Sequence, residues 1–156
     1  MAARKARPTL ALSLQFARDD TVRVHRQALS RSLVVRCLRA ALQRPAEITV
    51  RVVGEQEGLS LNRDYRGQDH ATNVLTFDYS SQPQVVADLV LCAPVIEREA
   101  VAMGIALADH YAHLLVHGVM HAQGYDHLDE AQAQQMEGLE TNVLAQLGVA
   151  DPYATS

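Results

Sequence analysis

One segment of this chain constrains its fold more than any other, because it combines an apolar helix with regularly spaced histidines. Residues 107–123 are apolar almost all round, and a helix of that kind is normally buried in a protein core. Histidines on such a helix need polar partners there. The segment carries histidines at positions 110, 113, 117 and 121, all within one narrow angular sector. Ordinary hydrogen-bonded packing does not explain such a group well.

The last two of these histidines and one that follows have the spacing of a metal site. His117, His121 and His127 read H-x3-H-x5-H. The first two lie one helical turn apart, so their side chains project from the same face. Gly124 accepts the left-handed conformation of a helix C-cap, so the chain can reverse there and return His127 as a third ligand. Three imidazoles leave one tetrahedral position open, which is typical of a catalytic rather than a structural zinc.

Geometry limits which histidines can share an ion. His113 and His121 are eight residues apart, which is about 12 Å along a helix and too far for one metal. We therefore expect His113 and His110 to support or pack beside the ligands, since metal-bound imidazoles need partners that fix their tautomer. We predict one Zn²⁺ per chain, although imidazole ligands also suit nickel, copper or iron.

The residue at position 118 argues that this chain is not one of the best-known enzymes with this histidine spacing. The metzincin peptidases have the pattern HExxHxxGxxH, in which the glutamate is the general base. Gly118 stands at that position here. The sequence therefore argues against an ordinary zinc peptidase, and Asp126 is the one replacement base that we consider.

Composition and patterning predict a single α+β domain. The 156 residues are 48% hydrophobic and 21% charged, which is ordinary for one globular domain. No apolar run reaches the roughly 18 residues of a membrane span or resembles a signal peptide, so we expect a cytoplasmic protein with no membrane partner. The cysteines, Cys37 and Cys92, are expected to be buried free thiols.

The expected elements give about four strands in one mixed sheet, with helices packed on it and the histidine helix buried. We expect a basic flexible tail at 1–8, the domain at 9–150 and a C-terminal tail at 151–156. The expected strands are 10–16, 48–53, 72–77 and 88–92. The expected helices are 22–43, 94–103, 107–123 and 130–147, with a short helix or turn at 55–66 and a connecting loop at 78–86.

Charge is distributed unevenly along the chain. Residues 1–45 hold ten Lys and Arg against two Asp and Glu, whereas residues 46–156 hold four against sixteen. A basic end on an acidic body suggests a local anion-binding surface, with nucleic acid as the leading ligand. A solvated helix explains the same charges equally well, because the arginines do not form one clean stripe.

Several motifs in sequence order resemble one known family. The run from His117 to His127 has the form HGxxHxxGYDH, which is the signature of the YbeY endoribonucleases, bacterial rRNA maturation factors. Upstream, residues 61–67 resemble the family's LNxxYRG segment, residues 71–77 its PTDVLSF segment and residues 87–90 its GDIxI strand. The resemblance covers roughly residues 10–148.

The chain departs from the family pattern at a few positions. Asn73 stands in place of the usual aspartate, and it matters most. If that aspartate performs charge-dependent work, this chain has lost it; if it only caps or hydrogen-bonds, asparagine can serve. The other departures are Ala71, Thr76, Ala87, Met120 and Ala122.

The resemblance implies a zinc-dependent, single-strand-specific endoribonuclease that acts in small-subunit rRNA 3′-end maturation and ribosome quality control. Its partners would be rRNA in the ribosome, with ribosomal or assembly proteins possible. It implies His117, His121 and His127 as zinc ligands and Arg66 as the functional arginine of the cleft. Zinc would lower the pKa of bound water to about 7, and arginine suits phosphate by its forked donors. The supporting candidates are His113, Asp126, Asp88 and Asn73.

Two other function classes stay open at this stage. In one, the chain is a non-catalytic ribosome-assembly factor whose metal staples the C-terminal helices together. In the other, it is a peptidase or small-molecule hydrolase that shares the zinc geometry, which Gly118 counts against.

Overall fold

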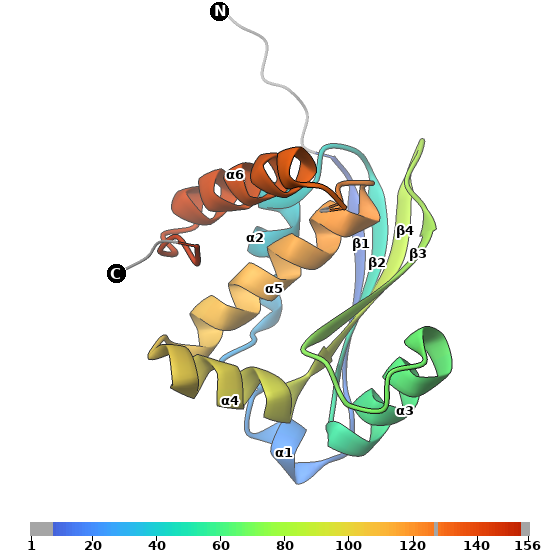
Figure 1. Cartoon of the computed structure of the whole chain (residues 1–156), viewed down its shortest axis with the longest axis vertical. Helices are drawn as coiled ribbons and strands as arrows, with labels where there is room; N and C mark the ends of the chain where they lie inside the picture. Colours follow the sequence, from blue (N-terminus) through green and yellow to red (C-terminus); the bar gives the residue numbers. More distant parts are fainter. Residues whose placement is uncertain (1–7, 127, 154–156) are drawn as a thin grey trace, which may run out of the picture.

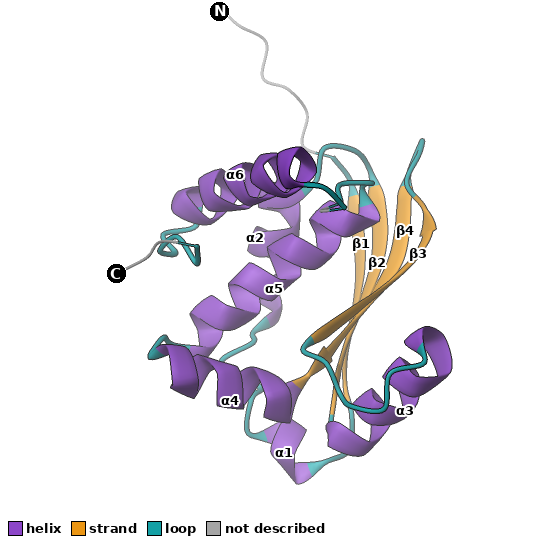
Figure 2. Ribbon diagram, in the orientation of Figure 1, coloured by secondary structure: helices purple, strands orange, loops and turns teal. Residues whose placement is uncertain are grey.

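The computed structural model describes residues 8–126 and 128–153, and within them it confirms the predicted α+β architecture. Its four strands form one sheet in the order β1-β2-β4-β3. β1, β2 and β4 run parallel, and β3 pairs antiparallel with β4 at the edge of the sheet (Figure 2). The strands are β1 Leu10–Phe16, β2 Ala46–Val53, β3 Val74–Ser80 and β4 Val85–Cys92.

Helices cover the two faces of the sheet unequally. Figure 1 shows α2, α4, α5 and α6 on one face, while α3 lies against the other. The helices are α1 Asp20–Arg23, α2 Arg31–Ala41, α3 Glu55–Arg66, α4 Ala93–Met103, α5 Leu107–Ala122 and α6 Glu130–Gln146. Residues 1–7 of the flexible tail predicted at 1–8 lie outside the described residues. Among the described residues, no helix is both long and apolar enough to cross a membrane.

The predicted helix at 22–43 is wrong as a single element, because the chain breaks between α1 and α2. Ser30 is extended there, with φ −71° and ψ 154°, and its side chain accepts a hydrogen bond from the Leu33 N–H. Serine is one of the preferred N-cap residues, so it favours the start of a new helix here. The preceding turn buries His25, whose ring bonds Tyr111 and Glu97. Helical periodicity alone does not reveal that long-range demand.

Helix α5 lies at the centre of the molecule and packs directly on the sheet. Ten of its residues are buried, as its apolar sequence predicts. The helix lies close to the sheet at Gly118, where an added Cβ would lie 3.0 Å from the Leu89 Cδ2 atom and 3.5 Å from the Thr76 Oγ1 atom. A longer side chain at position 118 would run into β3 and β4. The position of the peptidase glutamate therefore faces packed sheet rather than solvent.

This packing predicts opposite effects of alanine at two helical glycines. Gly118→Ala should lower the free energy of unfolding by about 1 kcal/mol, because overpacking costs about 1–3 kcal/mol and the helix-propensity gain is about 1 kcal/mol. Gly138→Ala, in the middle of α6 with no atom within 4 Å of the new Cβ, should raise it by about 0.5–1 kcal/mol. Urea denaturation measures both, and equal stabilisation by the two variants would contradict the close packing.

Candidate metal centre

A cleft of about 890 Å³ opens between β3, the C-terminal end of α3 and the histidine face of α5. Its floor and walls mix apolar, polar and charged groups. The lining residues are Tyr65, Arg66, Thr72, Asn73, Val74, Leu75, Thr76, Asp78, His113, Leu114, His117, His121, Gly124, Tyr125, Asp126, Leu128 and Tyr153. The cleft therefore gathers most of the polar residues that the sequence had singled out.

Two of the predicted ligands meet in this cleft. The Nε2 atoms of His117 and His121 lie 3.1 Å apart, and both side chains are partly buried. Two nitrogens bound to one tetrahedral zinc at about 2.0–2.1 Å would be about 3.3 Å apart. The pair therefore has the separation that a shared ion requires. The helix also ends as predicted, since Gly124 adopts φ +101° directly after α5.

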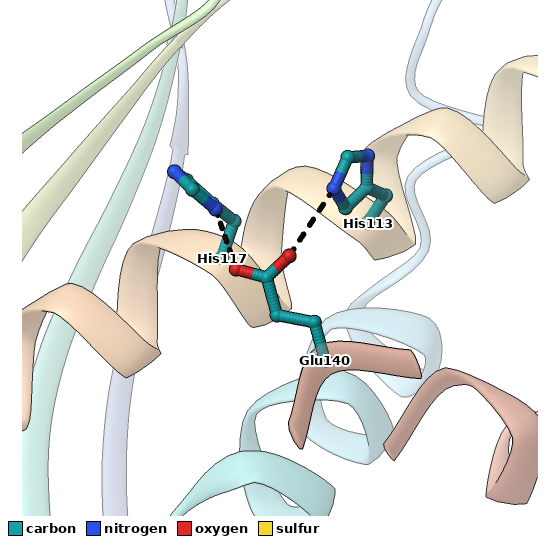
Figure 3. A group of neighbouring side chains, drawn as sticks. All are labelled: His113, His117 and Glu140. Carbon is teal, nitrogen blue, oxygen red and sulfur yellow. Dashed lines mark hydrogen bonds and ion pairs between the residues drawn. The ribbon is translucent and has the colours of Figure 1, made fainter. Parts of the chain in front are cut away.

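The other side of His117 is held by a buried carboxylate. Glu140 on α6 is 0% exposed, and its Oε1 atom lies 2.6 Å from the Nδ1 atom of His117 (Figure 3). Its second oxygen accepts a hydrogen bond from the Tyr153 hydroxyl and lies 3.5 Å from the His113 Nε2 atom. Burial raises the pKa of this carboxyl group, but hydrogen bonds from His113 and His117 outweigh burial and lower the pKa to about 2. Glu140 is therefore ionised at neutral pH.

An ionised Glu140 fixes the tautomer of His117. The Nδ1 atom carries the proton that the carboxylate accepts, so the lone pair of the neutral ring is on Nε2, the atom that approaches His121. A carboxylate that orients a metal-binding imidazole in this way is a common feature of metal sites. The structure thus presents the Nε2 atom of His117 to the cleft, as a metal ligand with a hydrogen-bonded Nδ1–H would.

The same residues offer a second place for a metal. Ligand atoms of His113, His117 and Glu140 lie within 4.8 Å of one another. An ion there would have to replace the 2.6 Å hydrogen bond between His117 and Glu140, and the carboxylate would then no longer orient the ring. We favour the cleft side of His117, because an ion there keeps that bond and also uses His121.

A second polar network supports the wall of the cleft. The Asn73 side-chain amide donates to Glu99, at 3.0 Å from Oε1, and its own oxygen accepts from the Val74 N–H at 2.6 Å. The His110 Nε2 atom lies 2.9 Å from the same Glu99 oxygen. Asn73 thus both caps β3 and ties it to α4. The asparagine at this position uses a donor that an aspartate would lack.

Of the remaining predicted site residues, some line the cleft and others do not. Arg66, His113 and Asp126 line the cleft. Asp88 does not, because its carboxylate accepts a hydrogen bond from Tyr79 on the opposite face of the sheet. His127 lies outside the described residues.

Two residues of this site were missed by the sequence reasoning. Glu140 is one. The sequence feature that could have indicated it is a carboxylate on the same helical face as the buried Met136 and Val143. Tyr153 is the other; it lies in the expected C-terminal tail, where no pattern indicates that it contacts Glu140. Contacts between distant segments of this kind depend on the fold.

Among the residues that the structure describes, no arginine of the basic N-terminal region lines the cleft, although Arg44 donates to the Gln123 carbonyl next to it. The residues that line the cleft all come from position 65 onward among those that the structure describes. The basic region forms β1, α1 and α2, and β1 and β3 are opposite edges of the sheet (Figure 1). Its arginines are therefore not part of the candidate metal centre.

Comparisons with known proteins point to one family. The sequence model of the family described as Endoribonuclease YbeY matches residues 13–148. Endoribonuclease YbeY from Methylibium petroleiphilum is 64% identical, over 97% of this chain and 99% of its own length. Endoribonuclease YbeY from Paracidovorax citrulli is 61% identical, over 93% and 96%. The solution structure of TM1509 from Thermotoga maritima has a similar fold, with a TM-score of 0.56 and 19% identity over 92% of this chain and 99% of that one.

Glu140 gives the first prediction for this site. Glu140→Gln should weaken zinc binding about 10- to 100-fold, because the neutral amide no longer holds the His117 Nδ1 proton with a full charge. Competition with a chromophoric chelator measures the affinity. Glu137→Gln removes an exposed carboxylate from the same helix and should bind zinc like the wild type. Equal affinities for all three proteins would contradict the orienting role.

The Asn73 network gives the second prediction for this site. Asn73→Asp should lower the free energy of unfolding by about 1–2 kcal/mol, because it replaces a hydrogen bond to the Glu99 carboxylate with two facing carboxylates. Adding Glu99→Gln should restore about 1 kcal/mol, since the bond re-forms with donor and acceptor exchanged and His110 keeps an acceptor. Thermal and urea denaturation of the two single variants and the double variant measure this coupling. Strictly additive effects would show that the two side chains do not interact.

Proposed function

Because this chain belongs to the endoribonuclease YbeY family and is thus an endoribonuclease, we propose that it is a zinc-dependent enzyme specific for single-stranded RNA. Its role would be maturation of the small-subunit rRNA 3′ end and ribosome quality control, in the cytoplasm and in contact with ribosomal or assembly proteins. His117, His121 and His127 are the proposed ligands of one zinc ion. The observation that carries the proposal is the approach of His117 and His121 over the cleft, with Glu140 behind them. His127 is included among the proposed ligands because of the spacing of the motif alone.

The residues of the chain fit the chemistry of zinc. Neutral imidazole nitrogens are ordinary zinc ligands, and Glu140 keeps His117 in the tautomer that presents Nε2. When bound, zinc would supply a Lewis acid and lower the pKa of a coordinated water to about 7. The partly buried histidine pair and the open cleft leave room for a phosphodiester beside the ion.

Arg66 is the proposed phosphate-binding residue. It ends α3 and lines the same cleft as the two histidines. A guanidinium donates two parallel N–H bonds to phosphate oxygens, so it orients the phosphodiester and spreads the negative charge that develops during cleavage. Asp126, which also lines the cleft, is the proposed proton acceptor.

A second function remains a specific alternative, because one observation favours it. The cluster of His113, His117 and Glu140 joins α5 to α6, so a metal bound there would staple the two helices. In that case the protein would be a metal-stabilised assembly factor, and loss of a ligand would lower the melting temperature with no separate catalytic effect. A peptidase is disfavoured by the packing of Gly118 against Leu89.

The proposal predicts loss of RNA cleavage in two variants that act differently. On a single-stranded RNA that spans a small-subunit rRNA 3′ end, His121→Ala prepared in the presence of zinc should show neither cleavage nor near-stoichiometric zinc. Arg66→Ala should keep zinc and lose about 10²- to 10³-fold in kcat/KM, the cost of removing one charge-stabilising donor. Gel-based cleavage assays and metal analysis by mass spectrometry provide the readouts.

A matched control is available on the same helix. Arg63 lies one turn before Arg66 and pairs with Asp69 at 2.8 Å outside the cleft, so Arg63→Ala should cleave like the wild type. Zinc binding without cleavage in the wild type, or equal cleavage by the wild type and His121→Ala, would overturn the nuclease proposal. A melting temperature that falls only with loss of the metal would then favour the assembly factor.

A further inference from the structure

Three aromatic side chains of α3 and β3 follow one another from the wall of the cleft outward. We call Tyr65, Phe77 and Tyr79 the aromatic strip. Tyr65, near the end of α3, lines the cleft and is 55% exposed. Its ring lies 4.4 Å from that of Phe77, measured between centroids. Tyr79 follows two residues later on β3 and is 66% exposed. One exposed aromatic ring therefore lines the cleft of the candidate metal centre, and a second lies farther along β3.

The strip continues from the cleft onto the outer face of the sheet. Phe77 is paired with Asp88 on β4, and the Tyr79 hydroxyl donates to Asp88 Oδ2 at 2.9 Å. These side chains therefore lie on the face opposite α5. Of the helices in the described ranges, α3 is the one on that face, and Figure 1 shows it beside one end of the strands. A ligand in the cleft can thus extend past Tyr65 onto an open surface.

The two tyrosines are held in place by neighbours. Phe77 is part-buried and packs at the edge of a small core with Leu75 and Val90, so it supports the Tyr65 ring from below. The hydrogen bond to Asp88 orients the Tyr79 ring and raises the pKa of its hydroxyl further above neutral pH. Rigid, neutral and exposed aromatic rings are suited to stacking against flat ligands.

We propose that the aromatic strip is a stacking platform for the bases of single-stranded RNA, with Arg66 holding the phosphate that enters the cleft. This inference rests on the proposed endoribonuclease function and names its substrate-positioning surface. Base–aromatic stacking is the usual means by which proteins hold unpaired nucleotides, and it tolerates any sequence because every base has a flat face.

The charges beside the strip decide how the strand runs. Arg66 lies on the cleft side, where the carboxylates of Asp78 and Asp126 also line the wall, whereas the Asp88 carboxylate lies beside Tyr79 on the outer face. A phosphate is therefore attracted to Arg66 itself and repelled by Asp88. The RNA backbone therefore follows the Arg66 side, and the bases turn toward Tyr65 and Tyr79. Since the strip itself carries no cation, its contribution to binding should depend on the bases and only weakly on salt.

The test compares RNA with and without bases on the full chain. A labelled single-stranded ten-nucleotide RNA and an abasic strand of equal length are titrated in the presence of a chelator, so that the RNA stays intact, and fluorescence anisotropy gives Kd. Wild type should bind the intact RNA more tightly than the abasic strand. Tyr65→Leu and Tyr79→Leu should each raise the Kd for intact RNA about five- to tenfold. The double variant should lose the preference for bases.

Conservative variants keep the test independent of folding. Tyr65→Phe and Tyr79→Phe retain the rings and should bind within about twofold of the wild type, and the leucine variants should keep their affinity for the abasic strand. Base-dependent binding that survives in the double leucine variant would overturn the stacking platform. Wild-type cleavage of the same RNA with zinc, run in parallel, separates this failure from that of the proposed function. Absence of both cleavage and binding in the wild type would overturn both proposals.

Discussion

The hydrogen bond between the buried Glu140 carboxylate and the Nδ1 atom of His117 is the contact on which the rest of the site depends. Taking a carboxylate out of water is costly unless hydrogen bonds replace its hydration. Here His117, His113 and Tyr153 contact the two oxygens. One group therefore joins α5, α6 and the C-terminal segment, and it also determines which nitrogen of His117 is offered to the cleft. Stability and function of the site thus depend on one buried charge.

The sheet sets the other boundary of the site. Helix α5 approaches β3 and β4 so closely at Gly118 that a side chain would collide with Leu89. One side of α5 packs against the sheet. The histidines lie on another side of the helix, where β3 and the end of α3 border a cleft of about 890 Å³. The absence of a glutamate at position 118, read from the sequence as evidence against a peptidase, thus has a direct packing cause.

The sequence predicted the elements whose residues carry their own signal. Alternating and β-branched runs located the strands, and α5 was placed to within one residue by its apolar pattern and Gly124. The prediction from sequence was wrong where contacts between distant segments determine the local structure. The helix predicted at 22–43 breaks because His25 binds Tyr111 and Glu97 on remote helices.

The same limit applies to the candidate site. Local spacing brought His117 and His121 together correctly, since both belong to one helix. Glu140 comes from another helix, and its role follows from the packing of α6 on α5. Asp88 was placed among the supporting candidates, but strand alternation points it away from the cleft, toward Tyr79. Sequence alone shows that alternate residues share a face, but it does not show which face meets the helices.

If Glu140 orients His117, a metal binds on the cleft side of the ring. Anomalous diffraction at the zinc edge, from crystals grown with zinc, locates the ion. We expect one strong peak about 2.0–2.1 Å from the Nε2 atoms of both His117 and His121, with the Glu140 hydrogen bond intact. A peak bonded to the Glu140 carboxylate and the Nδ1 atom of His117 would contradict it, because the carboxylate would then be a ligand rather than the group that orients one.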